Sequence, residues 1–99
     1  MAQDNPVTGA FTGTGTSDTF IPCISSKKTE SAFFNVSVWG TFVGTVQLQR
    51  SFDGGTTWIP TASYTAVDSD IGEEPEDSVL YRFECTAYTS GTINYRLSQ

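Results

Sequence analysis

Carboxylates are the most numerous side chains of this chain that could take part in acid–base or metal chemistry. The 99 residues include 11 acidic residues and no histidine, and six of the acids lie between Asp68 and Asp77. The spacing of Asp68 and Asp70 could begin a calcium loop, but Gly72 stands where an EF-hand needs its third ligand. We therefore expect no metal site, and we interpret residues 68–77 as a solvated loop of mutually repelling charges.

The same residues argue against an enzyme. Serine and threonine are plentiful, but a nucleophilic hydroxyl needs an activating base, and histidine, the commonest one, is missing. Glycoside hydrolysis needs two carboxylates that flank a cleft. Here Asp53 stands in a tight turn, and most other acids fall in one exposed segment. We expect no catalytic residue and no cofactor.

One short stretch specifies its own structure. It reads Ser51-Phe-Asp53-Gly-Gly55-Thr-Thr57-Trp58 and follows the alternating run from Thr45 to Arg50, which has the period of a β-strand. Asp-Gly-Gly tolerates positive φ, so the chain is expected to turn here and return as a second strand. The pattern S-x-D-x-G-x-T-W resembles the Asp-box, a hairpin motif of sialidases and other β-propellers. The resemblance implies a folding element in which Asp53 accepts hydrogen bonds from amides of its own turn. A propeller needs at least four blades, so a single such motif in 99 residues predicts no sialidase.

Charge narrows the classes of partner. The chain has five basic residues and a net charge of −6, so it has few cations with which to neutralise nucleic-acid phosphates or an anionic membrane. No apolar run approaches the roughly 20 residues that a membrane-spanning helix needs. The first residues, Met1 to Pro6, lack the basic flank and apolar core of a secretory signal. We expect a protein made in the cytoplasm that binds neither nucleic acid nor membranes.

Alternation of apolar and polar residues predicts an all-β chain. The clearest strands are Ala32–Trp39, with Phe34, Val36 and Val38 on one face, and Ser78–Tyr88. A strand after the Asp-box-like turn is expected to stop at Pro60. Seven or eight short strands without helical periodicity predict an immunoglobulin-like antiparallel β-sandwich. We expect one domain over residues 10–99, preceded by a flexible arm over residues 1–9.

The cysteines and aromatic residues leave alternatives open. The order Cys23, Trp39, Cys85 resembles the immunoglobulin pattern, but without a secretory signal two reduced, buried thiols are favoured over a disulfide. Five aromatic residues could line a sugar-binding platform: Trp39, Phe42, Phe52, Trp58 and Tyr88. We favour the alternative that Trp39 fills the core and Trp58 packs over its own hairpin, because a small sandwich needs such rings.

Two longer stretches carry a family resemblance. Phe34 to Trp58, which includes the Asp-box-like turn, and Glu74 to Gln99 are similar to a family of small all-β virion proteins of tailed bacteriophages. The similarity covers about two thirds of the chain, from Ala32 to the end. Such proteins decorate capsids, join heads to tails, or form fibre and baseplate domains. The resemblance implies a structural role in the virion and brings no catalytic residue with it.

We therefore expect a capsid decoration or cementing protein that assembles in the bacterial host cytoplasm and binds the major capsid protein or other virion proteins. It is expected to act in many copies or as a homo-oligomer. A tail adaptor or fibre module, and a carbohydrate-binding module, are the alternatives. The contact with the capsid is expected in the N-terminal segment, at Ala2, Gln3, Asn5, Pro6, Val7 and Phe11.

Overall fold

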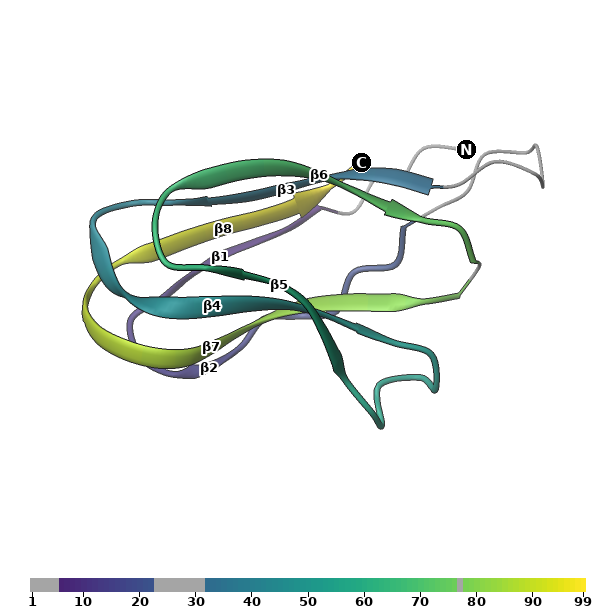
Figure 1. Ribbon diagram of the computed structural model, residues 1–99, viewed down its shortest axis with the longest axis horizontal. Helices are drawn as coiled ribbons and strands as arrows, with labels where there is room; N and C mark the ends of the chain where they lie inside the picture. Colours follow the sequence, from purple (N-terminus) through teal and green to yellow (C-terminus); the bar gives the residue numbers. More distant parts are fainter. Residues whose placement is uncertain (1–5, 23–31, 77) are drawn as a thin grey trace.

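The computed structural model describes residues 6–22, 32–76 and 78–99, and these form two packed antiparallel sheets (Figure 1). Sheet 1 has the strand order β1-β8-β3-β6, and sheet 2 has the order β2-β7-β4-β5. The eight strands are β1 (Val7–Phe11), β2 (Gly15–Thr16), β3 (Ala32–Trp39), β4 (Phe42–Ser51), β5 (Ile59–Tyr64), β6 (Asp68–Glu74), β7 (Leu80–Gly91) and β8 (Ile93–Ser98). The predicted all-β sandwich is confirmed.

The connectivity is that of a jelly roll. Antiparallel pairs form between β1 and β8, β2 and β7, β3 and β6, and β4 and β5, as if one long hairpin had been rolled up. The last two strands, β7 and β8, consequently lie in different sheets, whereas an immunoglobulin domain keeps its last two strands side by side. The turn between β4 and β5 is the tip of the rolled hairpin, and it is the Asp-box-like segment.

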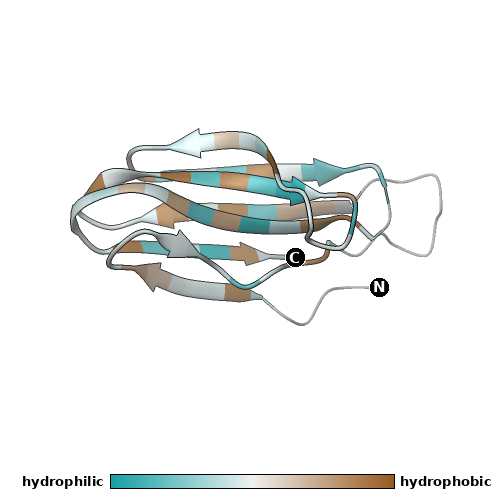
Figure 2. Ribbon diagram, turned by 90° about the horizontal axis from the view of Figure 1, so that it is seen from below, coloured by the Kyte–Doolittle hydropathy of each residue, from teal (hydrophilic) through white to brown (hydrophobic). Residues whose placement is uncertain are grey.

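Apolar residues alternate with polar ones along the strands, as Figure 2 shows. The apolar side chains that point inward fill the space between the two sheets. The predicted inward face of β3 is confirmed, with Phe34, Val36 and Val38 each at most 3% exposed. The core is rich in aromatic rings, and Phe83 lies at its centre with its ring centroid 5.5 Å from that of Tyr95. The core residues are Phe11, Phe20, Phe34, Val36, Val38, Val46, Leu48, Tyr64, Val79, Tyr81, Phe83, Cys85, Ile93, Tyr95 and Leu97.

The strand after the hairpin turn does not stop at Pro60. It continues to Tyr64, because β5 is an edge strand, where a proline without an N–H group can be accommodated. Thr61 is an extra residue opposite the β4 register shift between Leu48 and Gln49, and its hydroxyl donates to the Leu48 carbonyl at 3.2 Å. The prediction was wrong because a bulge absorbs the irregularity that was expected to end the strand.

The sheet also begins earlier than the sequence indicated. Val7, Thr8 and Gly9 were expected in a flexible arm, but they pair with Leu97, Arg96 and Tyr95 of β8. The expected arm residues 1–5 lie outside the described residues.

Candidate functional site

The β4–β5 turn has the hydrogen bonds that its sequence predicts. Ser51 is fully buried at the end of β4, and its Oγ accepts from the Gly55 amide at 2.9 Å and donates to Asp53 Oδ1 at 2.8 Å. The same Asp53 oxygen accepts from the amides of Thr56 and Thr57, at 3.2 and 2.8 Å. Gly54 and Gly55 have φ values of +74° and +99°, which explains why two glycines follow the aspartate.

These bonds fix the ionisation of Asp53. The Thr57 amide, followed by the Ser51 hydroxyl, lowers the pKa of Asp53 from 3.8 to about 2. The carboxylate is therefore charged at neutral pH, and its Oδ1 accepts three donors of the turn. Asp53 has the environment of a turn-stabilising residue rather than that of a general acid, which would need a raised pKa.

Trp58 packs over its own hairpin, as predicted. Its Nε1 donates to the Gly55 carbonyl at 3.0 Å, and the Arg82 guanidinium lies 4.2 Å from the ring centroid. Arg82 Nε donates to Gln49 Oε1 at 2.9 Å, and Gln49 Nε2 donates to Glu84 Oε1 at 2.7 Å. Sequence reasoning missed this network on the outer face of sheet 2, although the alternating polar residues of β4 and β7 signalled its position.

The five candidate aromatic residues do not form one platform. Trp39 is 43% exposed on the outer face of sheet 1, opposite Asn94, so the prediction that it fills the core was wrong. Its neighbour Val38 points inward, and strand alternation therefore turns Trp39 outward. Trp58 lies on the other sheet, and Phe42 and Tyr88 pack against the core.

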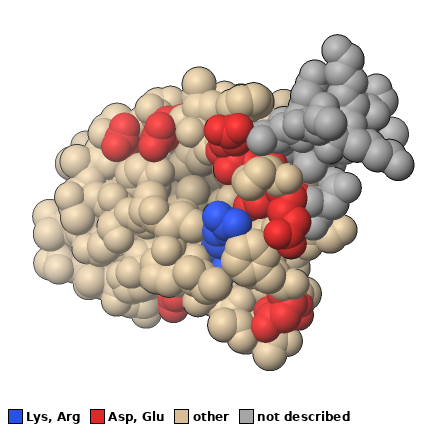
Figure 3. Space-filling view, turned by 45° about the vertical axis from the view of Figure 1, so that its right-hand side comes forward, with Lys and Arg blue, Asp and Glu red and all other residues tan. Residues whose placement is uncertain are grey.

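The acidic segment is mostly a strand and not a solvated loop. Asp68 to Glu74 form β6, which pairs with all but the last residue of β3. Gly72 makes close packing possible, because a Cβ atom there would overlap the Phe34 ring. Asp68 and Asp70 accept hydrogen bonds from the amides of the residues that follow them, at 2.8 and 2.9 Å. The like charges are tolerated because most of them are exposed to solvent on β6, which is an edge strand. Figure 3 shows acidic side chains on the molecular surface.

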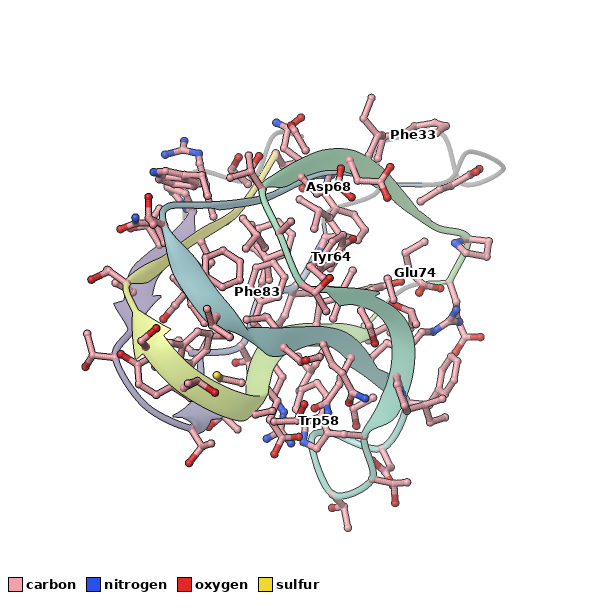
Figure 4. The ribbon with its side chains drawn as sticks, turned by 60° about the vertical axis from the view of Figure 1, so that its left-hand side comes forward. Phe33, Trp58, Tyr64, Asp68, Glu74 and Phe83 are labelled. Carbon is pink, nitrogen blue, oxygen red and sulfur yellow. The ribbon has the colours of Figure 1, made fainter. Side chains whose placement is uncertain are left out.

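Glu74 is the exception, since it is only 1% exposed. Its Oε1 accepts from the Tyr81 hydroxyl at 2.7 Å and lies 3.4 Å from Arg50 Nη2, while its Oε2 accepts from the Glu76 amide at 3.1 Å. Arg50 also stacks on the Phe52 ring, at 4.5 Å from the centroid. Figure 4 shows Glu74 on the inner side of the ribbon. A buried, paired carboxylate of this kind was not expected from the sequence.

A cavity of about 210 Å³ lies where the edge strands β5 and β6 face each other. Its walls include Phe34, Leu48 and Tyr64, with Asp70 among the polar residues. Burial, followed by the charges of Asp70 and Asp68, raises the pKa of Tyr64 to about 12. The volume is below the roughly 300–1,000 Å³ of typical small-molecule sites.

The described part of the chain has neither a cluster of metal-ligating side chains nor a membrane-spanning helix, and it includes one free thiol. Residues 6–22, 32–76 and 78–99 contain no group of three or more His, Cys, Asp or Glu residues that could hold a metal ion. Within those ranges no helix is long and apolar enough to span a membrane. Cys85 is a buried free thiol, and burial raises its pKa. Cys23 lies outside the described residues.

The expected N-terminal contact residues fall into separate groups. Ala2, Gln3 and Asn5 lie outside the described residues, and Pro6 is exposed. Val7 is partly buried in β1. Phe11 is only 6% exposed, and its ring centroid lies 4.8 Å from that of Tyr95. The structure therefore corrects the interpretation of Phe11, which is a core residue and not a contact residue.

The outer face of sheet 1 exposes large apolar side chains instead. Phe33 is 58% exposed and Ile71 is 70% exposed. Phe33 pairs with Glu73 and Asn35 pairs with Ile71, so Phe33 and Ile71 are diagonal neighbours on one face. Figure 4 shows Phe33 pointing away from the sandwich, on the side opposite to Trp58. We call Phe33 and Ile71 the outer patch.

Comparison with known proteins identifies no relative: no family model, no curated protein and no solved structure matches this chain. The functional assignment therefore depends on the residues and geometry described above.

Proposed function

We propose that this protein is a non-enzymatic structural component of a bacteriophage virion, and specifically a decoration protein that binds the capsid lattice. The resemblance of residues 32–99 to small tailed-phage virion proteins supports a structural role in the virion. By analogy, the jelly-roll connectivity is compatible with this role, since the fold recurs in viral capsid and lectin domains. The observation that carries the proposal is the outer patch.

The outer patch has the character of a protein contact. Exposed apolar side chains that lie side by side mark interaction sites more often than scattered single ones. Burying Phe33 and Ile71 against a partner is worth on the order of 1.5–3 kcal/mol each if they become fully covered. An aromatic side chain with polar surroundings is also a frequent energetic centre of protein interfaces.

The surroundings of the patch indicate the charge of the partner. Glu73 lies directly opposite Phe33, on the same outer face of sheet 1 as the patch. With a net charge of −6, the protein should dock on a capsid surface that carries lysine or arginine. Rim charges act mainly on the association rate, so binding should slow as salt concentration rises.

The test begins with copy number. Quantitative mass spectrometry of virions purified from the phage that encodes this chain should give one copy per capsid protein, or a simple fraction of that ratio. A handful to a few dozen copies per particle would move the protein to the connector or tail. Absence from the particle would overturn the virion proposal, and a glycan array would then test the carbohydrate-binding alternative.

The contact surface can be tested on particles that lack the protein. Phe33→Ser and Ile71→Ser should each weaken rebinding about tenfold or more, since each removes an apolar contact. Val43→Ser is the matched control, because Val43 is also 58% exposed but lies on β4 of the other sheet. Equal effects of Phe33→Ser and Val43→Ser would show that the outer patch is not the contact.

A further inference from the structure

Three of the four sheet edges carry features that prevent pairing with another strand. On β6, the carboxylates of Asp68 and Asp70 occupy the next residues' amides and add charge. On β5, Pro60 lacks an N–H group and the bulge at Thr61 bends the strand. β2 has only two residues. Charge, proline, bulges and shortness are the usual means by which proteins protect an edge.

The fourth edge, β1, has none of these features. Val7–Phe11 contains no charged residue and no proline, and its pairing with β8 shows no register shift. In the described part of the chain no strand lies beyond it, and Figure 2 shows β1, which follows the grey trace from N, along the lower border of the molecule. An uncharged, regular edge strand is a template for another strand.

The ladder shows which groups of β1 are available. The Thr92 amide donates to the Thr41 carbonyl at 3.3 Å, in continuation of the β3–β8 register. Bonded and non-bonded positions alternate in an antiparallel ladder, so even-numbered residues of β8 bond to β3 and odd-numbered ones bond to β1. The odd residues of β8 pair with the odd residues of β1. The N–H and C=O groups of Thr8 and Ala10 therefore point outward.

The β6 edge supports the same alternation independently. The amides of Ser69 and Ile71 bond to aspartate side chains, so they face away from β3. Bonded and non-bonded positions alternate in each ladder, and the pattern can be followed from β6 through β3 and β8 to β1. It again leaves the backbone N–H and C=O groups of Thr8 and Ala10 facing outward.

We propose that the free edge of β1 is a self-association surface on which β1 of a second copy of this chain adds in antiparallel orientation. The register that overlaps all five residues of β1 places a two-fold axis at Gly9. Thr8 then lies opposite Ala10 of the second copy, and the outward groups of both residues form four hydrogen bonds. Sheet 1 of the first copy and sheet 1 of the second copy then form one continuous eight-stranded sheet.

Glycine at the centre suits this arrangement. Gly9 opposite Gly9 is a non-hydrogen-bonded pair, in which the two backbones approach to about 4.5 Å. A Cβ atom on Gly9 would also crowd the Tyr95 hydroxyl beneath it. Neither copy therefore presents a side chain that would separate the strands at the axis.

The distribution of charge favours pairing of a second copy at the β1 edge rather than at the β6 edge of the same sheet. Six of the 11 acids lie in residues 68–77, and β6 is the opposite edge of sheet 1 from β1. Pairing through β1 keeps these acids three strands away from the contact on each side, or roughly 14 Å. In the described part of the chain, the basic residue nearest to this contact is Arg96, which pairs with Thr8 of β1. Because the two-fold axis lies at Gly9, Arg96 of one copy is offset from Arg96 of the other.

The test is the oligomeric state of the full chain. Sedimentation equilibrium should show the mass rising from 10.7 kDa towards twice that value between micromolar and millimolar concentration. Ala10→Pro removes one outward N–H group per copy and should weaken dimerisation about tenfold or more. Ser69→Pro is the matched control, since it removes an outward N–H group from β6, and it should leave dimerisation unchanged. A monomer at millimolar concentration, or a dimer that tolerates Ala10→Pro, would overturn the proposal.

A measurement on the unaltered chain covers the case in which Ala10→Pro does not fold. Amide hydrogen exchange at Thr8 and Ala10, read by NMR, should slow as concentration rises, while exchange at exposed amides of the β4–β5 turn stays constant. Concentration-independent exchange would contradict self-association. Protection that appears only when capsids are added to a monomeric protein would also contradict it, and would assign the edge to a capsid strand.

Discussion

Glu74→Ala should destabilise this protein far more than removal of any other carboxylate in the described part of the chain. Glu74 is 1% exposed, and its Oε1 accepts from Tyr81 and pairs with Arg50. Removing it leaves a buried hydroxyl without its acceptor and a guanidinium without its counter-ion. The Nε of Arg50 is already buried without a hydrogen-bond partner, so this side chain has little else to replace Glu74.

The magnitude follows from how deeply the pair is buried. Breaking a buried ion pair by removing one partner costs about 3–5 kcal/mol. The Arg50 side chain keeps 27% of its surface exposed, so water can partly solvate the orphaned charge. We therefore expect the lower end, about 3 kcal/mol, which corresponds to a fall in Tm of roughly 12–24 °C for a domain of this size.

The assay is chemical and thermal unfolding at neutral pH, with Glu73→Ala as the matched control. Glu73 precedes Glu74 on the same strand but is exposed, so its removal should change the free energy of unfolding by less than about 0.5 kcal/mol. Glu74→Gln should fall between the two, since the amide oxygen still accepts from Tyr81 while the charge is lost.

A double variant separates the orphaned charge from the lost packing. Arg50→Met combined with Glu74→Ala should recover part of the stability lost by Glu74→Ala alone, because no buried charge is then left unpaired. Equal stability of Glu74→Ala and Glu73→Ala would refute the reasoning. So would a double variant whose losses simply add.

Four further outcomes follow from the structure. The pKa of Tyr64 is raised to about 12, so the protonated hydroxyl contributes to the free energy of unfolding. This contribution is complete below pH 10 and is lost as pH rises towards 12. Tyr64→Phe should reduce that loss in denaturant unfolding. The pKa of Asp53 is lowered to about 2, so its contribution is lost as pH falls from about 4 towards 2, and Asp53→Asn should flatten this acid limb. Gly72→Ala should cost about 1–3 kcal/mol by forcing the ring beneath it to move, whereas Gly13→Ala, with nothing within 4 Å, should be nearly neutral in thermal unfolding. Deleting residues 1–5 leaves all five residues of β1 in the chain and should weaken the proposed capsid binding in a rebinding assay; unchanged binding would remove these residues from the contact.

Strands with one buried face could be predicted because their side chains alternate. Phe34, Val36 and Val38 predict the inner face of β3 without any knowledge of its partners, and they are buried. The β4–β5 turn could be predicted for a different reason. Its geometry depends on Ser51, Asp53 and two glycines within the turn itself, so local sequence suffices.

β6 could not be predicted, because what holds it in place is distant in sequence. Its carboxylates indicate solvent, and only the pairing with β3 and the fit of Gly72 over Phe34 make it a strand. Burial of Glu74 depends on Arg50 and Tyr81, which come from sheet 2. The jelly-roll order depends in the same way on pairs such as β1 with β8, which join the two ends of the chain. Alternation identifies strands but carries no information about which strands are neighbours.

The two proposed surfaces are compatible with each other. The outer patch lies on β3 and β6, whereas self-association uses β1, and β8 separates the two surfaces. A two-fold axis at Gly9 runs perpendicular to the sheet, so both outer patches would lie on the same side of the eight-stranded sheet. The two β3 strands would be five strand spacings apart, or about 24 Å. A pair of copies would thus present two equivalent patches to a repeating lattice, where binding of the first raises the effective concentration of the second. Weak contacts of a small patch would then be sufficient for the proposed decoration, since a lattice would supply matching sites and the pair would supply the second contact.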